Sequence, residues 1–142
     1  MPRLPILVSV TLLLAALTAP LAAQSTPAPT PRRLGTLDAL VDLPAGWTIR
    51  ANPTGFHLDD ETGRERVVIH PDPLLDGLFT RLPRGRRVTE RTLPSGARYY
   101  RRRDRDGIAI FVALTVDDER ALVCACEGPY EAVCTSLRRA AE

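Results

Sequence analysis

Two absences narrow the chemistry expected of this chain of 142 residues. It contains no Gly-x-Ser-x-Gly nucleophile turn and no His-Glu-x-x-His zinc motif, which are common signatures of hydrolases. It also contains no Lys, because all nineteen of its basic residues are Arg. A GC-rich genome explains that preference without a functional cause. Because the hydrolase motifs are missing, we expect a protein that is not an enzyme and that needs no cofactor.

Residues 1–23 follow the order of a secretory signal peptide: one basic residue, an apolar run and a stretch of small residues. The apolar run, from Leu4 to Leu17, is shorter than the roughly 20 residues that cross a bilayer as a helix. No Cys follows the small residues, so we expect no attached lipid. Cleavage is predicted after Ala23, or after Ala22, which gives a soluble periplasmic or secreted protein with no stable membrane anchor.

The rest of the chain divides into a linker and one domain. Residues 24–36 contain three Pro and no apolar pattern, which predicts an extended tether. Residues 37–142 are sufficient for a single domain with one core. An exported protein does not meet cytosolic nucleic acid, so we expect no nucleic-acid partner.

Short apolar segments separated by turn residues predict an antiparallel sheet in this domain. The expected strands are residues 37–43, 47–50, 56–58, 66–70, 86–93, 97–103, 108–116 and 121–126. Helical spacing of apolar residues predicts one helix at 73–82 and a second at about 129–140. The strands at 108–116 and 121–126 are apolar on both faces, so both faces must be covered. The predicted fold class is α+β, an antiparallel sheet packed with two helices, and a small β-barrel is the alternative.

One short segment resembles a known family of exported domains. Residues 41–47, Val-Asp-Leu-Pro-Ala-Gly-Trp, resemble the opening strand and Leu-Pro-x-Gly-Trp turn of small domains with a PsbP-like fold. That resemblance implies the same sandwich, in which an antiparallel sheet lies between helices.

Three Cys lie close together at positions 124, 126 and 134, and an oxidising compartment favours one disulfide among them. Cys124 and Cys126 share a face of their predicted strand. Counted back from Gly128, strand geometry places Cys126 roughly 7 Å away and Cys124 roughly 13 Å away. Helix geometry places Cys134 roughly 7.5 Å beyond Pro129. Cys126 and Cys134 therefore lie at similar distances from the turn, which favours a Cys126–Cys134 disulfide and leaves Cys124–Cys134 open. A metal site is not expected, because no fourth ligand is near in the sequence.

Charge is unevenly distributed, and one predicted hairpin is strongly cationic. Residues 81–106 hold ten Arg and three acids, whereas residues 107–131 hold five acids and one Arg. Within this region, residues 93–103 combine a turn with Tyr and Arg, which are the residue types that dominate protein interfaces. A charged edge strand that only prevents aggregation is the alternative. The residues expected to contact a partner are Ser95, Gly96, Arg98, Tyr99, Arg101 and Arg103.

The turn of this hairpin carries a second resemblance. Residues 95–99, Ser-Gly-Ala-Arg-Tyr, resemble the Ser-Gly-x-x-Tyr stretch of periplasmic lysozyme inhibitors. In that family the Ser and Tyr contact catalytic carboxylates, so the resemblance implies this role for Ser95 and Tyr99. The pattern Cys124-x-Cys126 followed by Cys134 on a final helix is also similar to that of small periplasmic immunity proteins that neutralise cell-wall toxins.

Together these features predict a non-enzymatic exported protein that binds another protein. The sharpest form of this hypothesis is an inhibitor or immunity protein against a cell-wall hydrolase or toxin. One alternative is an envelope-associated structural module whose Arg side chains bind anionic polymer or lipid head groups. A small enzyme built from His57, His70 and Asp59 is a weaker alternative, because cross-strand surface His are usually only solvated.

Overall fold

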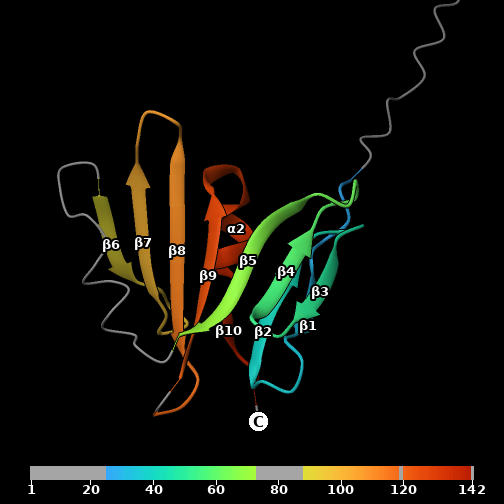
Figure 1. Ribbon diagram of the computed structural model, residues 1–142, viewed down its shortest axis with the longest axis horizontal. Helices are drawn as coiled ribbons and strands as arrows, with labels where there is room; N and C mark the ends of the chain where they lie inside the picture. The colour runs from blue at the N-terminus through green and yellow to red at the C-terminus, as the bar shows by residue number, and fades with distance from the viewer. Residues whose placement is uncertain (1–24, 73–87, 119, 142) are drawn as a thin grey trace, which may run out of the picture.

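The structure is a computed structural model that describes residues 25–72, 88–118 and 120–141. These residues form ten β-strands, one 3-10 turn and one short α-helix, and the strands are arranged in two sheets (Figure 1). The predicted signal peptide at 1–23 and the predicted helix at 73–82 lie outside the described residues. No helix in the described part is long and apolar enough to cross a membrane.

The larger sheet has seven antiparallel strands in the order β3-β4-β5-β9-β8-β7-β6. Its strands are β3 (Thr48–Asn52), β4 (Gly55–Asp59), β5 (Glu65–Asp72), β6 (Val88–Thr92), β7 (Arg98–Arg103), β8 (Ile108–Thr115) and β9 (Ala121–Glu127). Every strand that the sequence predicts in this region is present, with ends that differ by a few residues.

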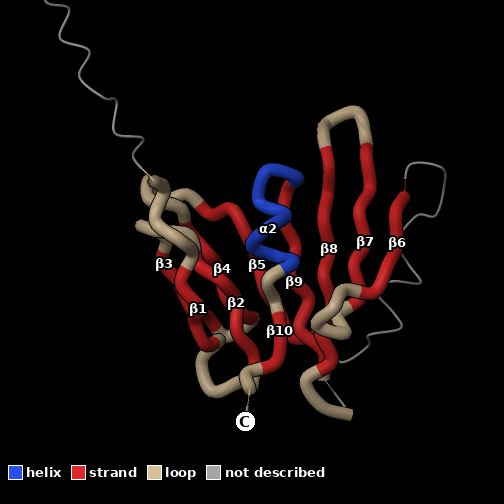
Figure 2. Tube along the Cα trace, turned by 180° about the vertical axis from the view of Figure 1, so that it is seen from behind, coloured by secondary structure: helices blue, strands red, loops and turns tan. Residues whose placement is uncertain are grey.

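The smaller sheet has the order β1-β2-β10, with β1 (Thr30–Arg33), β2 (Ala39–Leu43) and β10 (Arg138–Arg139). Figure 2 shows this sheet on the same face of the larger sheet as helix α2 (Glu131–Thr135). Strand β1 corrects the prediction of a tether, because it pairs with β2 and is followed by the fully buried Leu34. No sequence pattern predicts β1, because all its side chains are exposed and backbone pairing alone defines the strand.

The main core lies between the two sheets. Val41 of β2, Ile110 of β8 and Leu137 near the C-terminus are fully buried in it. A smaller cluster that includes Ala113 and Val123 is buried on the opposite face of the larger sheet. The prediction that β8 and β9 are buried on both faces is therefore confirmed.

The predicted α+β class is wrong, because the described chain is mostly β. The final helix, predicted at about 129–140, consists of the 3-10 turn η1 (Gly128–Tyr130) and the five residues of α2. The chain then leaves the helix because Leu137 is buried in the core and Arg138 pairs with Asp42 of β2 at 2.9 Å. The barrel alternative is also wrong, since β3 and β6 are open edges of the larger sheet in the described part. The two-helix sandwich implied by the PsbP-like resemblance is not found in the part of the chain that the structure describes.

Candidate functional site

Strands β6 and β7 form the predicted cationic hairpin at one edge of the larger sheet (Figure 1). The Leu93 N–H donates to the Ala97 carbonyl at 2.8 Å, and the Gly96 N–H donates to the Leu93 carbonyl at 2.9 Å. Gly96 has a φ of +82°, the left-handed conformation that three-residue hairpin loops require and that Gly adopts without steric cost. The Ser95 hydroxyl accepts a hydrogen bond from the Ala97 N–H at 3.4 Å, so it stabilises the turn itself.

The six predicted contact residues do not form one surface. Ser95 and Gly96 lie at the turn, whereas Arg103 ends β7 roughly 17 Å from Arg98. Side chains alternate along a strand, so Tyr99, Arg101 and Arg103 share the face that carries the main core. Arg98 lies on the opposite face, where its guanidinium is 2.9 Å from the Glu90 carboxylate.

Both tyrosines of the hairpin are buried, which the sequence pattern does not predict. Tyr99 is 2% exposed and Tyr100 is 1% exposed. The Tyr99 hydroxyl donates to Glu131 Oε1 of α2 at 2.6 Å. Burial, followed by this hydrogen bond and the charge of Glu131, raises the pKa of Tyr99 to about 12. Tyr99 therefore joins β7 to α2, and its burial disfavours the predicted direct contact with a partner.

Three arginines lie on the core-side face of the hairpin, where two are exposed and Arg101 is partly exposed. Strands β6 and β7 themselves lie to one side of α2 (Figure 2). Arg91 of β6 lies opposite Tyr99 and its guanidinium is 4.6 Å from the centre of the Tyr99 ring. Arg101 and Arg103 follow Tyr99 along the same face of β7. None of the three forms an ion pair among the described residues. We call Arg91, Arg101 and Arg103 the arginine row.

Sequence reasoning missed two residues of this site. Arg91 was not among the predicted contacts, although the length of the hairpin turn fixes the register that places Arg91 opposite Tyr99. Glu131 was also missed, and no sequence signal connects it with Tyr99, which is 32 residues away. The length of the turn was therefore sufficient to predict Arg91, but nothing in the sequence predicts Glu131.

The opposite end of the larger sheet carries paired charges. The guanidinium of Arg50 donates to both carboxylate oxygens of Asp59, at 3.1 and 3.2 Å, and lies 3.5 Å from Glu65. The side chain of Arg66 donates to Asp60 at 2.6 Å, and its guanidinium is 5.4 Å from the centre of the Tyr130 ring.

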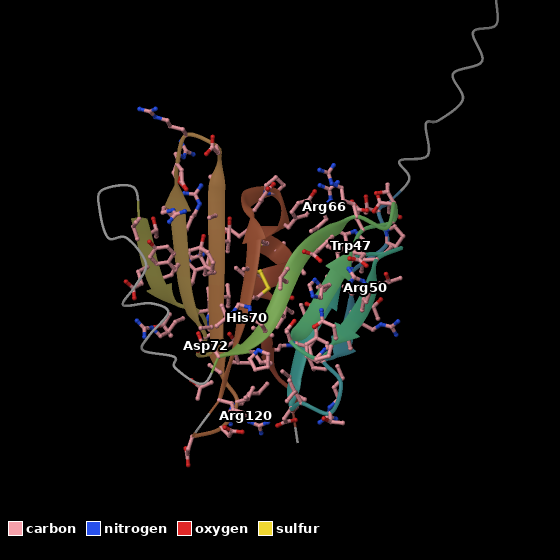
Figure 3. The ribbon with its side chains drawn as sticks, viewed as in Figure 1. Trp47, Arg50, Arg66, His70, Asp72 and Arg120 are labelled. Atoms are coloured by element: carbon pink, nitrogen blue, oxygen red, sulfur yellow. A yellow bond between two sulfur atoms is a disulfide. The ribbon has the colours of Figure 1, made fainter. Side chains whose placement is uncertain are left out.

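Figure 3 shows Arg66 and Trp47 at the same corner of the molecule. The ring of Trp47 meets that of Tyr130 edge-on, with 5.6 Å between the ring centres. These contacts tie the β3–β5 end of the sheet to η1, so the arginine at this corner serves the fold.

The two His of the first hairpin do not face each other. His57 lies opposite Val68, and His70 is two residues further along β5 (Figure 3). Nδ1 of His57 contacts the Glu65 carboxylate and its Nε2 contacts the Asn52 side chain. Both ring nitrogens of His57 therefore already have partners within the β3–β5 network.

A disulfide joins Cys124 of β9 to Cys134 of α2, with 5.5 Å between their Cα atoms, and Cys126 is the free thiol (Figure 3). The predicted disulfide is confirmed, but the favoured pairing, Cys126 with Cys134, is wrong. Cys124 and Cys134 are both fully buried in the main core, whereas Cys126, two residues nearer the end of β9, is only partly buried, so the thiol of Cys134 meets Cys124 rather than Cys126. Burial raises the pKa of the Cys126 thiol to about 12, with smaller contributions from Glu131 and Glu127.

No group of three His, Cys, Asp or Glu is placed to hold a metal ion in the part of the chain that the structure describes. In comparisons with known proteins, no family model matches this sequence and no curated protein matches it significantly. The functional proposal therefore rests on the geometry of the arginine row.

Proposed function

We propose that this chain is a non-enzymatic exported protein whose arginine row binds an acidic surface of another protein. The observation that carries the proposal is that Arg91, Arg101 and Arg103 share one face and have no ion pair among the described residues. Guanidinium groups form strong bidentate hydrogen bonds with carboxylates, so such a row suits an acidic partner.

Contacts within the protein already order part of the arginine row before a partner binds. Arg91 is stacked on Tyr99, and Tyr99 is held by Glu131 of α2. A side chain that is already ordered loses less conformational entropy when a partner binds, which favours affinity.

Two features support export. The predicted signal peptide at residues 1–23 is one, and the Cys124–Cys134 disulfide, which is compatible with an oxidising compartment, is the other. A cell-wall hydrolase is a suitable exported partner, because glycoside hydrolases carry a pair of carboxylates in their clefts. In that form the protein is an inhibitor or immunity protein.

The proposal is tested by capture of a partner on the immobilised protein from the exported-protein fraction of its source. The variant Arg101→Glu is compared with Arg32→Glu, which makes the same charge change at an exposed residue of β1. We expect a single protein to be captured by the wild type and by Arg32→Glu but lost by Arg101→Glu.

Equal capture by both variants contradicts the proposal. Binding of wall polymer or lipid vesicles instead, without a preferred protein and with a steep loss in salt, favours the envelope-associated alternative.

A further inference from the structure

Strand β6 leaves one edge of the larger sheet open. Residues 89–92 are all exposed, and among the described residues β6 pairs with β7 alone. The other exposed edges of the described part are less suited to accept a strand. Strand β1 contains Pro31, and β10 has two residues. In β3, the side chains of Arg50 and Asn52 already bind β4 and β5.

The hairpin turn determines which backbone groups of β6 face outward. Antiparallel strands alternate between residue pairs that exchange backbone hydrogen bonds and pairs that do not. Leu93 is hydrogen-bonded to Ala97, so Arg91 is the next residue of β6 to bond β7. The N–H and C=O groups of Glu90 and Thr92 consequently point away from β7, toward the open edge.

Charge at this edge selects the kind of strand that could be added. A second copy of β6 is disfavoured, because twofold pairing centred on Glu90 or on Arg91 would set that residue opposite its own copy, and like charges opposite each other are destabilising. A strand with carboxylates at alternate positions would instead place every carboxylate on one face. That face can be the one that carries Arg91, with Arg101 and Arg103 one strand further in.

We propose that β6 is a docking strand, to which an extended acidic segment of a partner protein adds as an eighth strand of the sheet with its carboxylates over the arginine row. This inference rests on the proposed function and specifies how the partner binds. Main-chain hydrogen bonds to Glu90 and Thr92 supply affinity, and the arginine row selects the acidic side chains.

The test uses the full chain and a short synthetic peptide of alternating Glu and Thr. Two modified peptides carry N-methyl groups on every Glu nitrogen or on every Thr nitrogen. All Glu nitrogens of an added strand point the same way, so only one of the two modified peptides has methyl groups directed at β6. We expect that peptide to bind at least about tenfold more weakly than the other, because hydrogen bonds to the edge are lost.

Amide hydrogen exchange gives a second measurement on the same complex. The amides of Glu90 and Thr92 should exchange rapidly in the free protein and become protected when the unmodified peptide binds, whereas those of Thr89 and Arg91 should be protected in both states. Arg101→Glu should abolish peptide binding and Arg32→Glu should not.

Failure of this inference is distinguishable from failure of the proposed function. If the two methylated peptides bind equally and Glu90 and Thr92 stay unprotected, strand addition is overturned. Absence of peptide binding also overturns it, and the function still stands if Arg101→Glu loses the captured protein. If Arg101→Glu changes neither peptide binding nor capture, both proposals fail.

Discussion

The two ends of the larger sheet use arginine in opposite ways. At the β3–β5 end, Arg50 and Arg66 bind the carboxylates of Asp59 and Asp60, and the pairs link neighbouring strands and turns. At the β6–β7 end, Arg101 and the rest of the arginine row have no ion pair in the described part of the chain. These arginines cannot be told apart by composition, but only those at the β6–β7 end remain available to a partner.

This difference follows from where the acids lie. The turn between β4 and β5 supplies Asp60 beside Arg66. Near the arginine row, Glu90 of β6 and Asp104, which follows β7, pair instead with arginines of the opposite face. Alternation along β7 therefore leaves one face of the hairpin neutralised and the other cationic. Net charge near zero can thus coexist with a specific cationic site.

The largest expected effect comes from the disulfide that lies between the two ends. Replacing Cys124 and Cys134 by Ala should lower the free energy of unfolding by about 2–4 kcal/mol, because the unfolded chain is no longer cross-linked. Without the disulfide, α2 should no longer be held against β9, and the hydrogen bond from Tyr99 to Glu131 should weaken. Amide protection should therefore fall more at the hairpin end than at the β3–β5 end. Urea unfolding gives the free energy, and residue-resolved amide exchange compares the two ends.

The control for this change is Cys126→Ala, which alters the free thiol and keeps the disulfide. Equal loss of protection at both ends in the double variant would show that α2 does not hold the hairpin in particular.

A smaller effect is expected from Asp60→Asn at the paired end. Hydrogen bonds from the Thr62 hydroxyl, the Arg66 guanidinium and backbone N–H groups hold the pKa of Asp60 well below its usual range. The ionised carboxylate therefore stabilises the fold above about pH 4, the usual pKa of Asp in an unfolded chain, and this stability is lost as the pH falls through the lower folded pKa.

Urea unfolding of both proteins over a pH series measures this contribution. The wild type should be more stable than Asp60→Asn at neutral pH, and the difference should shrink as the solution becomes acidic. Asp118→Asn, at an exposed Asp with no ion pair in the described chain, should behave as the wild type. A difference that does not depend on pH would show that the charge of Asp60 is not what stabilises this end.

The sequence predicted the strands well because the alternation of β2 and the two apolar faces of β8 and β9 are local signals. It failed for the last helix, because whether residues 136–140 continue a helix depends on β2, which is far away in sequence. Asp42 of β2 binds the Ser136 side chain and Arg138, and the chain pairs there instead.

The same distinction holds for the site. The cationic hairpin and its turn were predictable from composition and turn residues, whereas the burial of Tyr99 was not. Tyr99 is buried because α2 packs beside it and Glu131 accepts a hydrogen bond from its hydroxyl. Contacts between segments this far apart leave no periodic pattern in a single sequence.

The smallest expected effect comes from the arginine row itself. Arg101→Gln should change the free energy of unfolding by no more than about 0.5 kcal/mol, because it leaves no carboxylate without its partner. Arg66→Gln should destabilise the protein more, since it deprives Asp60, which is 9% exposed, of its charged partner.

Thermal unfolding at low and high salt then separates the two ends. The arginines of the row repel one another, so salt should stabilise the wild type by screening them, and Arg101→Gln should gain less from salt. At the paired end salt weakens an attraction instead, so Arg66→Gln should gain more from salt than the wild type does. If Arg101→Gln were as destabilising as Arg66→Gln, the row would be part of the fold, and its availability to a partner would no longer follow from its missing ion pairs.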